Sequence, residues 1–130
     1  MKHKVFFLTL LMSALFYAGC EKIETGKSFD NIVSDKSRVD SSLSFSIDSV
    51  NDYRCPVDVV CIWAGDVDIH IRFYKTFGHI DTLMNLYNPD KNPISIGGYS
   101  FKVNEVNPVP VSNKVIPQKD FKINMTITKD

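Results

Sequence analysis

The stretch VDIHIRFYKTFGHIDTLMNLY, residues 67–87, decides the fold class. Apolar and polar residues alternate through residues 67–74 and again through residues 80–87. A period of two is typical of a strand that has one buried and one exposed face. The five residues between the two runs include Gly78, which suits a hairpin loop because glycine readily adopts positive φ. The stretch therefore predicts two antiparallel strands joined by a hairpin.

Three further segments repeat this alternation, at residues 43–48, 99–104 and 121–128. Weaker strands are expected at 29–33 and 94–96, which makes about seven. Apolar residues keep helical spacing for three turns nowhere after residue 20. Two packed sheets bury all the apolar faces, so we predict an all-β, antiparallel β-sandwich, with a small β-barrel as the alternative. The prolines between residues 108 and 117 predict an edge or an extended connection.

The first twenty residues, MKHKVFFLTLLMSALFYAGC, have the layout of a secretory signal. Lys2 and Lys4 precede an apolar run that is too short for a stable membrane span. The final Ala-Gly-Cys resembles a bacterial lipobox, although Tyr17 occupies the place where such boxes usually carry Leu. The resemblance implies cleavage before Cys20 and a lipid, such as palmitate, on Cys20. The alternative is a secreted protein that is cut elsewhere and leaves Cys20 unpaired.

This interpretation divides the chain into a signal peptide (1–19), a lipidated tether (20–28) and a single β-sandwich-like domain (29–130). It also predicts the bacterial cell envelope as the location, with the domain held to a membrane through Cys20 and facing the periplasm or the exterior. Loss of Lys2 and Lys4 leaves a slightly acidic mature chain without a basic stripe. Nucleic-acid binding is therefore not expected, because it needs clustered Lys and Arg.

Two cysteines, Cys55 and Cys61, remain once Cys20 is assigned to the lipid. In an oxidising compartment a disulfide between them is expected. A redox pair usually has two intervening residues rather than five. A tetrahedral metal site would need two more ligands, and His70 and His79 are the histidines left in the mature chain. We therefore predict a structural disulfide and no metal.

Both of these cysteines fall within RCPVDVVCIWAG, residues 54–65, and a second motif, EVNPVP, occupies residues 105–110. The pair resembles a pattern found in small, mostly uncharacterised bacterial secreted proteins and lipoproteins, in which such a loop leads into a strand. The resemblance covers roughly residues 43–128. It implies a β-sandwich-like domain and brings no reaction, ligand or catalytic residue.

The residue types in this loop indicate a cross-linked projection that begins at Arg54. Pro56 fixes one backbone angle, and Gly65 lets the chain turn into the next strand. Trp63 is large enough to cover the disulfide and cap the core, which is the role that we expect. The alternative is that Trp63 is an exposed platform for a ligand.

Asp66, Asp68 and His70 share one face of the strand that starts at residue 67, and Asp58 is close in sequence. Such a face could bind a divalent cation. Solvated acidic side chains that discourage strand pairing explain the same pattern, and we favour that interpretation.

Residues arranged for nucleophilic catalysis are not evident, and the chain lacks a phosphate-binding glycine loop. The predicted function is therefore a binding or structural accessory module for an envelope protein or glycan, without a cofactor and not an enzyme. A small metal-binding protein or enzyme using the Asp66–His70 face is the alternative. Ser49 and Thr82 lie in short Asp-Ser/Thr-apolar patterns that resemble O-glycosylation acceptors of some Bacteroidetes.

Overall fold

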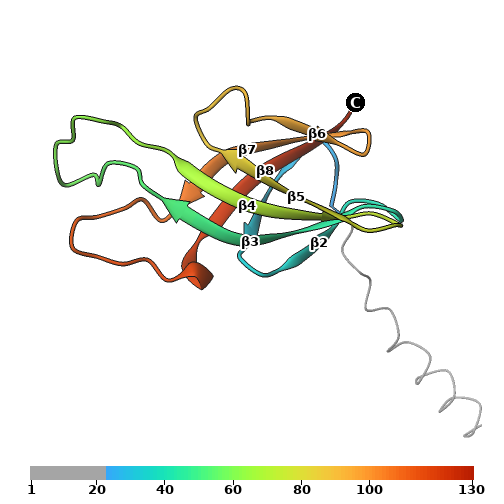
Figure 1. Ribbon diagram of the computed structural model, residues 1–130, viewed down its shortest axis with the longest axis horizontal. Helices are drawn as coiled ribbons and strands as arrows, with labels where there is room; N and C mark the ends of the chain where they lie inside the picture. The colour runs from blue at the N-terminus through green and yellow to red at the C-terminus, as the bar shows by residue number, and fades with distance from the viewer. Residues whose placement is uncertain (1–22) are drawn as a thin grey trace, which may run out of the picture.

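The computed structural model describes residues 23–130, which form eight strands in two sheets (Figure 1). Both sheets are antiparallel and have four strands, in the orders β1-β8-β7-β6 and β2-β3-β4-β5. The predicted β-sandwich is therefore confirmed, and the sheets do not close into a barrel. The strands are β1 (Ser28–Ile32), β2 (Lys36–Arg38), β3 (Ser44–Asp52), β4 (Val67–Tyr74), β5 (His79–Asn85), β6 (Ile94–Ile96), β7 (Tyr99–Asn107) and β8 (Lys122–Lys129).

All five strongly alternating segments are strands, and both weaker ones are confirmed as β1 and β6. The predicted hairpin is present, with Tyr74 paired to His79, and a second hairpin pairs Ile96 with Tyr99. The three-residue β2 was not predicted, because Lys-Ser-Arg has no apolar alternation to reveal it. The proline-containing residues 108–117 form an extended connection that ends in a short 3₁₀ helix, η2 (Gln118–Asp120).

The core lies between the sheets and is built from the inward side chains of both. Phe45 and Phe73 from one sheet meet Phe101 from the other, with ring centroids 5.7 and 4.8 Å from that of Phe101. All three are fully buried, and branched aliphatic residues surround them. Edge-to-face aromatic contacts of this kind add stability beyond the area that they bury.

A β-bulge interrupts the alternation once in each sheet. The register shifts between Ile47 and Ser49 in β3, and between Val103 and Glu105 in β7. Val50 and Val106 each lie three positions after the preceding core residue, so in a regular strand without a bulge they would point to solvent. Both are buried. The bulges thus keep the strands packed as far as the end of the sandwich from which the long loops leave.

The chain meets the sandwich earlier than the predicted domain boundary at residue 29. Ile23 packs against the core, and the Gly26 N–H donates to the Ile127 carbonyl at 2.7 Å. Residues 23–28 of the predicted tether (20–28) therefore contact the domain, whereas residues 20–22 lie outside the described residues. Residues 23–28 lie at the end of the sandwich that carries the β4–β5 hairpin, opposite the long loops (Figure 1).

Candidate functional site

Two long loops project side by side from one end of the sandwich (Figure 1). We call residues 54–65, between β3 and β4, the cysteine loop, and residues 108–117, after β7, the proline loop. The Val57 N–H donates to the Pro110 carbonyl at 3.0 Å, so the two loops are in direct contact. The two motifs singled out in the sequence are thus brought together in space, although about forty residues separate them in the chain.

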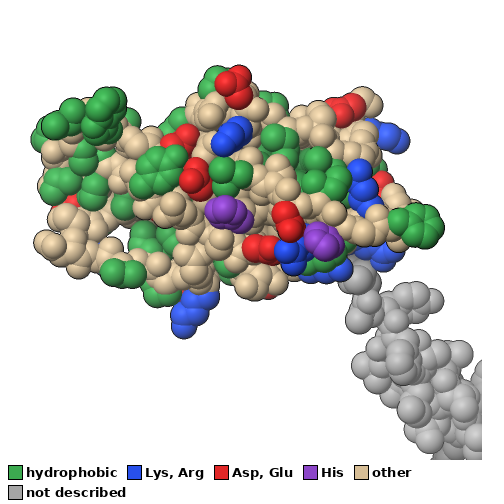
Figure 2. All heavy atoms as spheres, in the orientation of Figure 1, with side chains coloured by type: hydrophobic (Ala, Val, Ile, Leu, Met, Phe, Trp, Pro, Cys, Tyr) green, Lys and Arg blue, Asp and Glu red, His purple; other side chains and the backbone are tan. Residues whose placement is uncertain are grey.

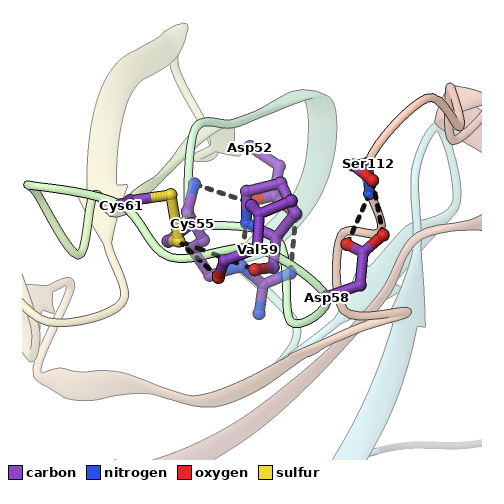
Figure 3. Close-up of a disulfide and its surroundings, with 8 residues drawn as sticks. Asp52, Cys55, Asp58, Val59, Cys61 and Ser112 are labelled. Atoms are coloured by element: carbon purple, nitrogen blue, oxygen red, sulfur yellow. Dashed lines mark hydrogen bonds and ion pairs between the residues drawn. A yellow bond between two sulfur atoms is a disulfide. The ribbon is translucent and has the colours of Figure 1, made fainter.

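The predicted disulfide is present: Cys55 and Cys61 are bonded and close a ring within the cysteine loop (Figure 3). Below the ring, the Cys55 N–H donates to the Ala64 carbonyl at 2.8 Å, which extends the β3–β4 ladder into the loop. Inside the ring, the Pro56 carbonyl accepts the Val59 N–H at 3.3 Å and so forms a turn. The loop is therefore held at its base, across its middle and within its ring.

Gly65 is required where the cysteine loop returns to β4. Its φ is +71°, and a Cβ atom at this position would lie 2.0 Å from the Tyr53 carbonyl oxygen. A side chain would therefore clash with backbone as well as strain the left-handed conformation. The predicted role of Gly65 as a turn residue agrees with this geometry.

Arg54 joins the cysteine loop to the other sheet. Its Nε and Nη2 donate to the two Asp52 carboxylate oxygens at 2.8 and 2.6 Å. Nη1 donates to the Val106 carbonyl, and Nη2 also reaches the Pro108 carbonyl. The two side chains are only 8% and 5% exposed, and the hydrogen bonds to Asp52 raise the pKa of Arg54. The ion pair with Asp52 was not predicted, and the bonds to Val106 and Pro108 leave no signal in the sequence because their acceptors are backbone carbonyls.

Asp58 supplies a second link between the loops. The Ser112 N–H donates to Asp58 Oδ1 at 2.8 Å, and the Ser112 hydroxyl donates to Oδ2 (Figure 3). These hydrogen bonds lower the pKa of Asp58. The Asp58 carboxylate thus holds the proline loop.

Trp63 does not pack against the disulfide or cap the core, and that prediction is wrong. Its side chain is 81% exposed. The bulged ends of β3 and β7 bring Val50 and Val106 inward, and these side chains fill this end of the core. The cysteine loop carries Trp63 beyond the sheets, into solvent.

Trp63 belongs to a group of exposed apolar side chains on the cysteine loop. We call this group the apolar tip. Figure 2 shows hydrophobic side chains gathered at the end of the molecule from which the cysteine loop projects (upper left). The apolar tip consists of Val57, Val59, Val60, Ile62 and Trp63.

The Asp66–His70 face does not form a ligand set. The Asp66 carboxylate accepts the backbone N–H groups of Val67, Leu86 and Tyr87, so it holds the end of β5. Asp68 accepts hydrogen bonds from Tyr53 and Asn85, while His70 is exposed on the outer face. Within residues 23–130, no three His, Cys, Asp or Glu side chains are grouped to hold a metal ion.

The outer face of β3, β4 and β5 carries an open, polar depression beside His70. Arg72 forms a two-point ion pair with Asp81 there, at 2.6 and 3.0 Å, and the hydrogen bond to Asp81 raises the pKa of Arg72. The half-buried Ser49 and Thr82 line the same depression. Their glycosylation stays a prediction.

Cys20 and the predicted signal peptide lie outside the described residues. Within residues 23–130, no helix is long and apolar enough to cross a membrane. Comparison with known proteins found no matching family model, no similar curated protein and no similar solved structure. The apolar tip and the two loops that support it are therefore the candidate site that the geometry itself offers.

Proposed function

We propose that this chain is a lipid-anchored binding module of the bacterial cell envelope, and that the apolar tip is its contact surface. The observation that carries the proposal is the exposure of five large apolar side chains on one braced loop. Scattered exposed apolar residues are ordinary on protein surfaces, whereas a contiguous group is typical of an interaction site.

Exposure of these side chains has an energetic cost. Full burial of a Val or Ile side chain stabilises a fold by about 1.5–3 kcal/mol. Each exposed Val or Ile of the apolar tip lacks most of this stabilisation. The support of the apolar tip is also unusually complete, because a disulfide, a buried ion pair and the Asp58–Ser112 link all act on it. A loop that is already ordered loses little conformational entropy when it binds. A recognition loop requires this combination of a rigid backbone and exposed apolar side chains.

The envelope location and the lipid on Cys20 rest on the N-terminal sequence pattern. Replacement of Cys20 by Ser should release the protein into the soluble fraction or leave its signal peptide uncleaved. A Cys20→Ser protein that is normally processed and stays in the membrane fraction would contradict the anchor. This test is independent of the apolar tip, so the two parts of the proposal can fail separately.

The binding role is tested with full-length protein recovered from its native envelope, comparing Trp63→Ala with Phe77→Ala. Phe77 is the matched control, because it is also a highly exposed aromatic residue and lies in the β4–β5 hairpin at the other end. Both changes should shift the free energy of unfolding by less than about 0.5 kcal/mol, as surface substitutions do. Only Trp63→Ala should lose a bound component, whether protein, glycan or lipid. Equal retention by both variants would contradict the proposal.

A further inference from the structure

We infer that the apolar tip inserts into an uncharged, apolar groove on a different protein, at the end of the domain that faces away from the anchoring membrane. This inference rests on the proposed function and specifies its partner. Three observations carry it: the chemistry of the tip, the absence of available charge around it, and the place where the described chain begins.

The tip offers aliphatic surface rather than sugar-binding chemistry. Four of its members are Val or Ile, which cannot hydrogen-bond to hydroxyl groups. The polar side chains at its base are already used, because Asp52 and Arg54 bind each other and Asp58 binds Ser112. A glycan stacked on Trp63 would find few free hydrogen-bond partners. An apolar protein groove needs none.

Charge around the tip also disfavours a lipid surface. Loops and helices that dip into membranes usually surround their apolar residues with Lys and Arg. Asp58 is the one charged residue from 55 to 63, and Lys114 is the one basic residue in the proline loop. Arg54 is buried against Asp52. An uncharged partner surface fits this arrangement better than anionic headgroups do.

The start of the described chain excludes the chain's own N-terminus as the occupant. Ile23 lies at the β4–β5 hairpin end, as the Gly26–Ile127 hydrogen bond and the β1–β8 register require. The nine-residue β3 spans roughly 30 Å of the sandwich. After cleavage before Cys20, residues 20–22 could reach only about 10 Å. Three residues are too few to span from Ile23 to the apolar tip.

The same placement disfavours docking of the apolar tip onto the hairpin end of a second copy. The apolar tip projects, so it needs a recess, and an open depression lined by Leu43, Phe77 and polar neighbours lies at the hairpin end. Copies anchored in one membrane share one orientation. The tip of one copy and the hairpin end of the next would then lie at different heights above the membrane.

The test is site-specific photo-crosslinking of the full-length protein in its native envelope. Benzoylphenylalanine replaces Ile62, which is 95% exposed, or Phe77, which is 93% exposed, as the matched control. We expect a discrete adduct with a different protein from position 62 and none from position 77. Adding Trp63→Ala to the position-62 chain should reduce this adduct at least about tenfold, since Trp is a common interface hot spot.

The crosslinked protein is then purified and titrated against uncrosslinked chains. Trp63→Ala and the independent variant Val60→Ser should each weaken its Kd at least about tenfold, while Phe77→Ala should change it less than twofold. Four results would overturn the inference. They are an adduct of twice the chain's mass, an adduct within one chain, equal adducts from both positions, and a Kd that Trp63→Ala does not change. A Trp63-dependent lipid or glycan adduct would also overturn the inference while leaving the proposed function standing. The absence of any Trp63-dependent adduct would overturn both.

Discussion

The two ends of the sandwich each expose a large aromatic side chain, Trp63 at the loop end and Phe77 at the hairpin end. Phe77 lies in a short turn that one backbone hydrogen bond closes, from the Lys75 N–H to the Gly78 carbonyl at 3.0 Å. Trp63 lies among other exposed apolar residues, on a loop that a disulfide and an ion pair support. Exposure is similar at both ends, but support is not.

The difference separates an incidental exposed residue from a candidate site. Phe77 is a single exposed apolar residue at a turn tip, and such residues are ordinary on protein surfaces. The cysteine loop is held from within, from below and from the neighbouring proline loop, so its apolar side chains stay presented to solvent. Changes that loosen this support should affect the loop end and spare the hairpin end.

The largest effect is expected from Arg54→Ala, which leaves the Asp52 carboxylate buried without its partner. Removal of one member of a buried ion pair costs about 3–5 kcal/mol. Urea unfolding should show this loss, and amide exchange should rise in both long loops. Arg72→Ala is the control, because Arg72 makes the same two-point contact with Asp81 on the open outer face. If both variants lost the same free energy of unfolding, burial would not strengthen the Arg54–Asp52 ion pair.

Two glycines provide the next comparison between the ends. Gly65→Ala should lower the free energy of unfolding by roughly 3 kcal/mol, because strain and a backbone clash combine there. Gly78 also has positive φ, but a Cβ atom there would meet nothing within 4 Å. Gly78→Ala should therefore cost only the conformational strain, about 1–2 kcal/mol. Thermal or chemical denaturation of both variants measures the difference, and equal values would contradict the clash at Gly65.

Removal of the disulfide should have a smaller effect on stability than on the loop. The double variant Cys55→Ser, Cys61→Ser should lose about 2 kcal/mol, as expected for so short a ring. Amide exchange should rise within the cysteine loop and stay unchanged in the β4–β5 hairpin. Unchanged exchange in the loop would mean that the hydrogen bonds alone hold the apolar tip in place.

The smallest expected effect is the loss of the Asp58–Ser112 link at acidic pH. Hydrogen bonds from Ser112 lower the pKa of Asp58, so this link stabilises the folded state above the unfolded carboxyl pKa of about 4. The contribution should disappear as the pH falls from there towards the lowered value. Ser112→Ala should raise the pKa of Asp58, measured by NMR titration. The pKa of Asp40, which backbone N–H donation from Ser42 lowers to about 2 at the hairpin end, should stay unchanged. A constant Asp58 pKa in Ser112→Ala would contradict the link.

Most of the strands could be predicted because alternation is a local property of the sequence. The bulges could not, since an inserted residue such as Asp48 only shifts the phase of the pattern, and nearby partners decide where the shift falls. The same limit applies to Gln118, whose amide donates to and accepts from the Val50 backbone across sixty-eight residues. Side-chain-to-backbone bonds of this kind leave no pairing signal in the sequence.

The residues of the candidate site were visible in the sequence, but their arrangement was not. Spacing and an expected oxidising compartment were enough to predict the Cys55–Cys61 disulfide, and glycine chemistry was enough to predict the turn at Gly65. The exposure of Trp63 could not be predicted, because it depends on how the loop leaves the packed sheets rather than on the residue type. Residue types and spacing determined which side chains form the loop, whereas packing between distant strands decided that Trp63 faces solvent and that Asp58 holds Ser112.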